Sequence, residues 1–231
     1  MKAFCILSFI FLAGQGYAQH KEYRWYVGEV KLADGIILTG QLAYDIAYDV
    51  VKHQGQQGLR TYSTLHVEEF SFVDTTYYLP RKFYSLPFNV QPDYKRLMLF
   101  ESLTEGKLSL FAREKKIRIE PTMDDMIGMV PMVGAEREPL SSQWETRYDF
   151  YVGDSLGRLY DLTENTQEGL LQLMQDQMVA MRQYVKAKNP DFSKRDDVVT
   201  IVRYYNALSN ASQSLDPDIE IIRSGSKIPI W

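Results

Sequence analysis

Hydrophobic and polar residues alternate along most of the chain from Trp25 to about Leu162, and short polar turns interrupt the alternation repeatedly. A period of two places every second side chain on one buried face, which is typical of β-strands. We therefore expect about nine short antiparallel strands here. Two clear hairpins are segments 97–103 and 107–111 around Glu105-Gly106, and segments 148–152 and 158–162 around Gly153–Gly157.

The first hairpin contains enough apolar residues to predict its register. A three-residue loop at Ala33–Gly35 sets Val30 opposite Leu38, so that the apolar side chains share one face. A two-residue loop would instead set Val30 opposite Thr39. We expect the longer loop, with Gly35 in the left-handed conformation.

The pattern changes to helical spacing after Thr163. Asn165 followed by Glu168 resembles a capping box, and Asn189-Pro190 ends the first helical run. We expect two amphipathic helices, followed by a loosely ordered tail. The apolar stripes are Leu170, Leu171, Met174, Met178, Met181 and Val185 in the first helix, and Val198, Ile201, Val202, Tyr205 and Leu208 in the second.

These patterns predict an α+β fold. A β-rich region over 19–162 would form a sandwich or an open barrel, and a two-helix region over 163–209 would pack on it. The tail covers 210–231. Between the last strands, Pro121 to Gln143 shows no steady period, and its length marks it as a candidate functional insert.

Residues 1–18 have the layout of a secretory signal peptide. Lys2 precedes a short apolar run, and Gly16-Tyr17-Ala18 places small residues where a signal peptidase cuts. The run is shorter than the about 20 residues that span a bilayer. We expect an exported mature chain from Gln19, located in the periplasm, in the cell envelope or outside the cell.

Composition excludes further classes of site and partner. Cys5, the only cysteine, lies in the leader, so the mature chain would have no disulfide, catalytic cysteine or cysteine-ligated metal. The formal charge is −4, and losing Lys2 with the leader makes it −5. We expect neither nucleic acid nor anionic lipid as a partner, and no membrane segment once the leader is removed.

Basic residues do cluster at one place in the chain. Arg113, Lys115, Lys116 and Arg118 lie close together, with Glu114 and Glu120 interleaved among them. We expect a solvated strand edge there rather than an anion site.

Local motifs for catalysis are missing. The three histidines, His20, His53 and His66, lack the spacing of a zinc site, and we expect them at the surface or its rim. No nucleophilic serine elbow and no phosphate-binding glycine loop occurs. The sequence therefore designates no catalytic or cofactor-binding residue.

Paired carboxylates remain, and a fold can bring two of them to the separation that a glycosidase uses. Asp45 and Asp49 flank a turn, where they are expected to bind backbone donors. Asp196 and Asp197 suit the first turn of a helix. The remaining pairs are Glu68 with Glu69 and Asp124 with Asp125.

Methionine recurs every third residue in the irregular segment, at Met123, Met126, Met129 and Met132. Thioethers are soft ligands that suit Cu(I), which makes these residues copper candidates. Methionine is also a flexible gap-filler, and its apolar neighbours here favour packing or contact with a partner.

Aromatic residues make up 13% of the chain. On an exported β-fold, exposed aromatic rings can stack on sugars, although strands also use them for packing. The pattern leaves Tyr77, Tyr78, Tyr84 and Trp144 undecided between these roles.

Two resemblances accompany these patterns. Val30–Gly35, with Gly40-Gln-Leu42 and Tyr44-Asp45, is similar to the first motif of Sm-like small barrels. Leu59-Arg60-Thr61 stands where that family has an Arg-Gly signature, so the similarity implies shared strand–turn geometry without RNA binding. Over nearly its full length the chain resembles exported Bacteroidota proteins of unknown function, which implies no activity. The segments that carry this second resemblance are Gly28–Gly35, Phe83–Pro87, Gly106–Leu110 with Arg113-Glu114, Tyr148–Tyr151 and Tyr204–Asn206.

Together these observations favour a non-enzymatic envelope or secreted protein with a protein or glycan partner. The main alternative is a hydrolase of envelope or dietary polymers, with carboxylates brought together by the fold. A copper-binding methionine segment is a further alternative.

Overall fold

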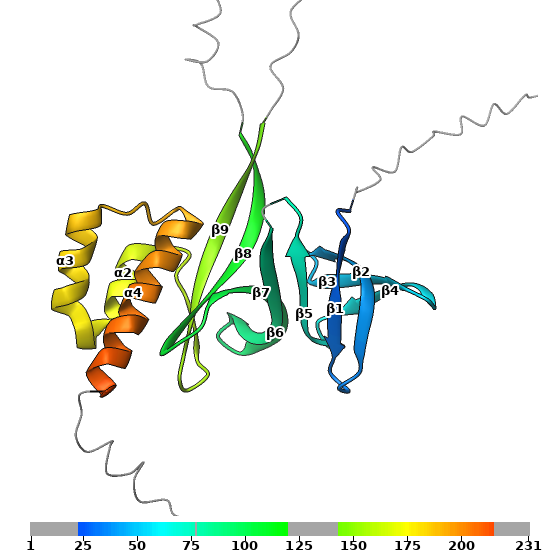
Figure 1. Cartoon of the computed structure of the whole chain (residues 1–231), viewed down its shortest axis with the longest axis horizontal. Helices are drawn as coiled ribbons and strands as arrows, with labels where there is room; N and C mark the ends of the chain where they lie inside the picture. The colour runs from blue at the N-terminus through cyan, green and yellow to red at the C-terminus, as the bar shows by residue number, and fades with distance from the viewer. Residues whose placement is uncertain (1–22, 77, 120–142, 215–231) are drawn as a thin grey trace, which may run out of the picture.

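The computed structural model describes residues 23–76, 78–119 and 143–214 of the chain. These residues form one open antiparallel sheet followed by a layer of helices, an α+β fold (Figure 1). The strands are β1 (Tyr26–Leu32), β2 (Ile37–Asp45), β3 (Val50–Gly55), β4 (Gly58–Ser63), β5 (Val67–Asp74), β6 (Leu79–Gln91), β7 (Tyr94–Thr104), β8 (Leu108–Ile119), β9 (Gln143–Asp154) and β10 (Leu159–Asp161). The helices are α2 (Thr166–Leu173), the short 3₁₀-helix η1 (Gln175–Gln177), α3 (Met178–Lys188) and α4 (Arg195–Ser214).

The sheet has ten strands in the order β10-β9-β8-β7-β6-β5-β1-β2-β3-β4. Successive strands pair as hairpins, except that β5 returns to pair with β1. The described residues therefore contain one strand more than the nine or so that the alternation predicts. They form a single sheet rather than the two sheets of a sandwich.

The predicted register of the first hairpin is confirmed. Val30 pairs with Leu38, and the amide of Leu32 donates to the carbonyl of Ile36 at 2.8 Å. Gly35 has a φ of 86°, the left-handed conformation that the three-residue loop requires. The hydrophobic pattern alone was sufficient here because a shift of one residue would move the apolar set to the solvent face.

The part of the sheet that contains β1 to β5 curls. The turns between β2 and β3 and between β4 and β5, towards one end of the strand order, contact β7 near its middle. The amide of Leu99 in β7 donates to Oδ1 of Asp49 in the β2–β3 turn at 2.9 Å. The Thr64 hydroxyl, between β4 and β5, donates to the Leu97 carbonyl at 3.1 Å. The curl encloses an aromatic-rich core of Tyr26, Val30, Leu42, Ile46, Val51, Val67, Phe70, Phe72, Phe83 and Leu99.

The helices form a second layer against β8 and β9 (Figure 1). This helical layer, α2 to α4, buries most of the predicted apolar stripes, although Met178 and Val185 are only half-buried and lie outside the core. The core that it shares with the sheet consists of Leu103, Leu108, Leu110, Ala112, Phe150, Val152, Leu162, Leu170, Met174, Met181, Val198, Val199, Ile201, Val202 and Tyr205. No helix of the described residues has both the length and the apolar character needed to cross a membrane.

The helical region differs from the prediction in two ways. The capping box forms as expected, with the amide of Glu168 donating to Oδ1 of Asn165 at 3.1 Å. The expected first helix, however, is broken at Met174 into α2, η1 and α3, which makes three α-helices instead of two. In addition, α4 continues to Ser214, past Asn210 where the tail was expected to begin.

A tertiary contact accompanies the break between α2 and α3. Asp176 in η1 accepts a hydrogen bond from the Lys107 ammonium at 2.6 Å and one from the Tyr205 hydroxyl at 2.8 Å. Both donors lie far from Asp176 in the sequence. The apolar stripe runs through the break, since Met174 and Met181 are both fully buried, and so it gives no local sign of the interruption.

Candidate functional site

A buried carboxylate interrupts the apolar face of β7. Glu101 lies on the same face as Leu99 and Leu103, which belong to the aromatic core and to the helical core respectively. Only 2% of Glu101 is exposed. A charge at this depth is tolerated only when it is paired and hydrogen-bonded.

Two arginines supply that pairing. Arg81 in β6 binds Glu101 in a bidentate manner, with Nε 2.9 Å from Oε1 and Nη2 2.7 Å from Oε2. Arg195, at the start of α4, donates from Nη2 to Oε1 at 3.0 Å. Glu101 thereby connects the sheet to the helical layer through charge-assisted hydrogen bonds, the strongest class in proteins.

Further acidic and aromatic groups surround Arg81. Its Nη2 also donates to Glu114 at 3.2 Å, and its Nη1 lies 3.8 Å from Asp74. Burial would lower the pKa of Arg81, but hydrogen bonds and charge from Glu101 outweigh it and raise that pKa. The guanidinium carbon also lies 5.1–5.8 Å from the ring centres of Tyr44, Phe72 and Phe83. We call Asp74, Arg81, Glu101, Glu114 and Arg195 the ion cluster.

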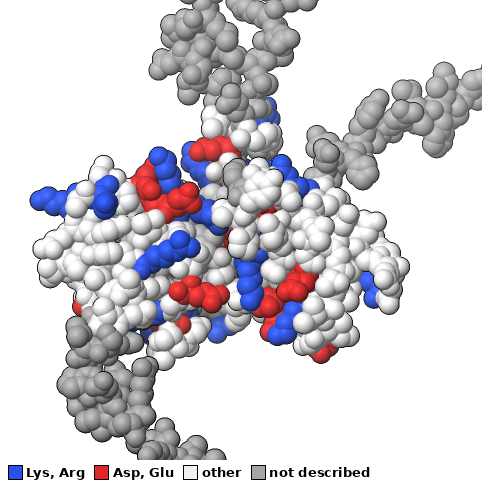
Figure 2. Space-filling view, viewed as in Figure 1, with Lys and Arg blue, Asp and Glu red and all other residues white. Residues whose placement is uncertain are grey.

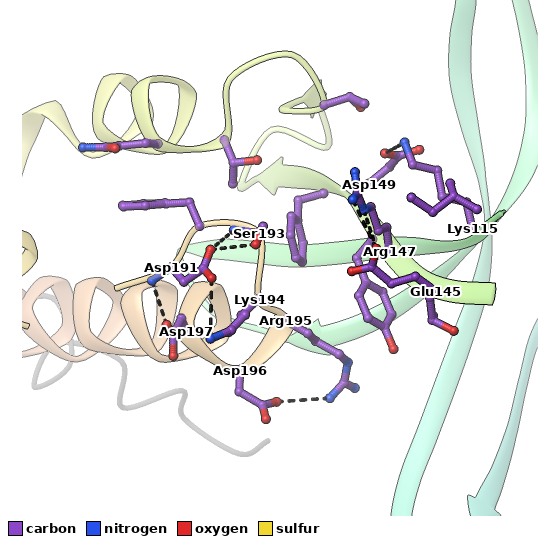
Figure 3. Close-up of a pocket in the computed structure, with 18 of the residues that line it drawn as sticks. Lys115, Glu145, Arg147, Asp149, Asp191, Ser193, Lys194, Arg195, Asp196 and Asp197 are labelled. Atoms are coloured by element: carbon purple, nitrogen blue, oxygen red, sulfur yellow. Dashed lines mark hydrogen bonds and ion pairs between the residues drawn. The ribbon is translucent and has the colours of Figure 1, made fainter. Parts of the chain in front are cut away.

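A cleft of about 1440 Å³ opens beside the ion cluster, and Arg81 and Arg195 line it. One wall is the β8–β9 arm, where residues 114–119 of β8 pair with residues 143–148 of β9. The arm extends past Ala112, the last residue of β8 that pairs with β7. The other walls are the segment 163–167 and the turn 191–197 that leads into α4 (Figure 3).

Two pairs of oppositely charged side chains lie along the arm. Lys115 donates to Asp149 at 2.5 Å, and Arg147 lies 3.1 Å from Glu145 (Figure 3). On the face seen in Figure 2, acidic and basic side chains likewise interleave between the helical layer and the middle of the sheet. The walls of the cleft therefore carry both positive and negative charges, and neither sign forms a continuous surface.

Hydrogen bonds fix the turn that leads into α4. Oδ1 of Asp191 accepts hydrogen bonds from the hydroxyl and the amide of Ser193, at 2.6 and 2.9 Å, and these hold the pKa of Asp191 below its usual value. The amide of Asp191 in turn donates to Oδ2 of Asp197 at 2.7 Å. These carboxylates are engaged in shaping the wall of the cleft (Figure 3).

The three carboxylate pairs that lie within the described residues have structural partners. Asp45 accepts from the Ala47 amide at 3.2 Å, as expected for a turn, and Asp196 and Asp197 lie in the first turn of α4. The other described pair forms cross-strand ion pairs, Glu68 with Lys31 and Glu69 with Lys82. Asp124 and Asp125 lie outside the described residues. Among residues 23–76, 78–119 and 143–214, no group of three His, Cys, Asp or Glu side chains is arranged to hold a metal ion.

The interpretation of the basic cluster as a solvated edge is wrong for Arg113. Its side chain is only 11% exposed and binds Oδ1 of Asp49 at 2.6 Å. It also donates to the carbonyls of Leu99 and Ile46, at 2.7 and 2.6 Å. Arg113 fills the space where β7 and β8 diverge, whereas Lys115, Lys116 and Arg118 are exposed.

The surface assignment of the histidines is also wrong in one case. His53 is only 7% exposed, and its Nε2 lies 3.1 Å from the Thr39 carbonyl. Two glycines leave room for the ring, since a Cβ at Gly40 or Gly55 would lie within 2.8 Å of it. His66 is exposed, as expected, and pairs with the Ser63 hydroxyl at 3.1 Å.

The remaining sequence candidates divide between exposed residues and residues outside the described ranges. Tyr78 and Trp144 are 82% and 66% exposed, while Tyr84 is half-buried. The leader, His20, Tyr77 and the copper candidates Met123, Met126, Met129 and Met132 lie outside the described residues.

Sequence reasoning missed the ion cluster entirely. Glu101 is a single acidic residue within an apolar strand, and that interruption of the alternation was the available signal. Its two arginines come from positions 81 and 195, so nothing local indicates that they meet. No protein-family model, no curated protein and no solved structure matches the chain.

Proposed function

We propose that the protein is an exported, non-enzymatic binding protein that holds its ligand in the cleft between the β8–β9 arm and the helical layer. The observation that carries this proposal is the pairing of the charges in and beside the cleft. Glu101 is held by two arginines, and the carboxylates of Asp149 and Asp191 are engaged by Lys115 and Ser193. Such groups offer fixed donors and acceptors to a ligand.

The ion cluster supports binding by making the cleft rigid. Arg81 comes from β6, Glu101 from β7 and Arg195 from α4, so one set of hydrogen bonds joins three elements around the cleft. A preorganised site loses less conformational entropy when a ligand binds, and its affinity is higher for that reason.

The rival proposal is a hydrolase that uses two converging carboxylates. Glu101 and Glu114 do converge, because both contact Nη2 of Arg81. A general acid and its partner carboxylate have to face the substrate, however, and here the Arg81 guanidinium engages both Glu101 and Glu114. The geometry therefore supports binding better than acid–base catalysis.

The cleft can be blocked from two sides to test this function. Thr146 in β9 and Gln167 in α2 are exposed residues that line the cleft, so a tryptophan at either position would obstruct part of it with little effect on the core. Thr61→Trp in β4 is the matched control, an exposed strand position far along the strand order.

The experiment uses the chain from Gln19, immobilised and exposed to the solubilised envelope of its native host. We expect a component that the wild type and Thr61→Trp both retain and that Thr146→Trp and Gln167→Trp release. Equal retention by all four proteins, or retention by none, would contradict the proposal. N-terminal sequencing of the protein from its host tests the export step separately.

A further inference from the structure

We infer that the cleft binds a neutral saccharide chain, an inference that rests on the proposed function and names its ligand. Three properties of the cleft lead to this ligand class. They are the pairing of its charges, the aromatic rings among its lining residues and its size.

The first property is that most charges on the cleft walls occur as ion pairs. Lys115 pairs with Asp149 at 2.5 Å and Arg147 with Glu145 at 3.1 Å. A hydroxyl group both donates and accepts hydrogen bonds, so a sugar can donate to the carboxylate and accept from the cation of one pair. An ionic ligand would instead compete for one partner and leave the other without its counter-ion, which costs free energy.

The net charge of the lining leads to the same conclusion. Seven acidic and five basic side chains line the cleft, which gives a formal charge of −2. This excess disfavours an acidic polymer, although salt screens it. The interleaving of both signs also gives a basic polymer no continuous acidic track (Figure 2). A ligand without charge avoids both costs.

The second property is the presence of aromatic rings in the lining. Tyr148 and Phe192 are half-buried residues of the arm and of the turn before α4. The Tyr148 ring stacks on Phe150 with centroids 6.3 Å apart, which fixes its orientation. Flat, fixed rings provide apolar surface for the C–H face of a sugar. The Tyr148 hydroxyl is protonated at neutral pH, and burial raises its pKa further above the ordinary value of 10, so it can donate a hydrogen bond to a sugar.

The third property is size. Pockets for single small molecules occupy about 300–1,000 Å³. The cleft, at about 1440 Å³, is larger and lies between an extended hairpin arm and a helical layer. Such a space suits several linked sugar rings better than one compact metabolite.

The experiment measures binding by titration calorimetry with neutral hexasaccharides of glucose, xylose and N-acetylglucosamine. An oligogalacturonate and a peptide of alternating lysine and glutamate serve as the charged probes. The proteins are the chain from Gln19, Thr146→Trp, Asp149→Asn and the control Thr61→Trp. Asp149→Asn leaves Lys115 without its counter-ion and keeps the size of the side chain.

We expect at least one neutral hexasaccharide to bind the wild type and Thr61→Trp equally. Thr146→Trp should weaken that binding by at least about tenfold because the indole occupies the cleft, and Asp149→Asn by a few-fold. Affinity should change by less than about twofold between about 0.05 and 0.5 M salt, because the ligand is uncharged.

Two results would overturn the inference in distinguishable ways. If only a charged probe binds and Thr146→Trp abolishes that binding, the ligand class is wrong while the cleft remains a binding site. If no probe binds in a manner that depends on Thr146 and no envelope component is retained in the capture experiment, both the inference and the proposed function fail.

Discussion

Asn206 in α4 binds both backbone groups of Leu108 in β8. Its Oδ1 accepts from the Leu108 amide at 3.0 Å, and its Nδ2 donates to the Leu108 carbonyl at 2.8 Å. The two residues are 98 positions apart in the sequence. Because β7 ends at Thr104 and first pairs with β8 at Leu110, the Asn206 amide takes the place of a strand partner and attaches the helical layer to the sheet.

Asn206→Ala should therefore destabilise the protein strongly. Asn206 is 6% exposed, and its loss leaves a buried amide and a buried carbonyl without partners. We expect the free energy of unfolding to fall by about 2–4 kcal/mol in urea titrations. Arg203→Ala removes an exposed side chain from the same helix and should change it by less than about 0.5 kcal/mol. Similar values for the two variants would show that Asn206 does not attach the layers.

Gly106→Ala tests the same contact from the other side. A Cβ at Gly106 would lie 2.4 Å from Nδ2 of Asn206, too close for both to keep their positions. We expect Gly106→Ala to cost stability in the wild type and distinctly less in an Asn206→Ala background, where the clash is absent. A double-mutant cycle of urea titrations measures the difference, with coupling expected at about 1 kcal/mol or more. Additive effects would contradict the predicted clash.

Glu101→Gln tests whether the ion cluster holds the sheet and the helical layer together. The change leaves Arg81, which is only 13% exposed at its side chain, without its main counter-ion. Breaking a buried pair in this way should lower the free energy of unfolding by about 3–5 kcal/mol. Glu29→Gln is the control, an exposed position in β1, and it should have almost no effect. An unchanged midpoint for Glu101→Gln would rule out this role of the cluster.

Arg113 provides a comparison of buried and exposed cations on one strand. Arg113→Met leaves Asp49 buried without its closest cation, and we expect a loss of about 3 kcal/mol. Lys116→Met removes the same formal charge from an exposed position of β8 and should cost less than about 0.5 kcal/mol. Thermal unfolding of both variants at neutral pH makes the comparison. Equal losses of stability in the two variants would mean that the positive charge of β8 stabilises the fold, and that the contact of Arg113 with the β2–β3 turn does not.

Asp176 should make the helical layer sensitive to acid. Burial opposes ionisation, but hydrogen bonds from Lys107 and Tyr205 outweigh it and lower the pKa of Asp176. A lowered folded-state pKa contributes stability above the unfolded-state pKa of about 3.9, and that contribution is lost as pH falls through the folded-state value.

Asp176→Asn, which keeps an acceptor for Tyr205, should therefore cost about 0.5–1 kcal/mol at pH 7, since the pair is partly exposed. The gap between the variant and the wild type should narrow as the pH falls below the unfolded-state pKa of about 3.9 and through the lower folded-state value. Urea titrations across this range measure it, and a gap that stays constant with pH would contradict the charge effect.

Local patterns were reliable where the interaction that decides the structure is itself local. The register around Ala33–Gly35 follows from which residues share a face, and the Asn165–Glu168 cap follows from spacing along one helical turn. Alternation likewise located the hairpins at Glu105-Gly106 and Gly153–Gly157. In each case the competing arrangement would expose apolar side chains or leave backbone donors unpaired.

The errors concern polar residues whose partners are distant in the sequence. Arg113 was expected in solvent and His53 at the surface, yet a buried turn carboxylate binds the first and two glycines make room for the second. The break after Met174 coincides with contacts from Lys107 and Tyr205 to Asp176. Alternation predicts whether a side chain faces the core or the solvent. It does not predict which residues that side chain will contact.

By itself, the sequence determined the fold class, most strand and helix positions, the first register and the absence of local catalytic motifs. The tertiary structure alone decided the curl of one open sheet, the ion cluster around Glu101 and the cleft beside it. The physical reason is that a buried charge is stable only beside its counter-charges. Arg81, Glu101 and Arg195 come together only once β6, β7 and α4 have been placed by the burial of apolar surface.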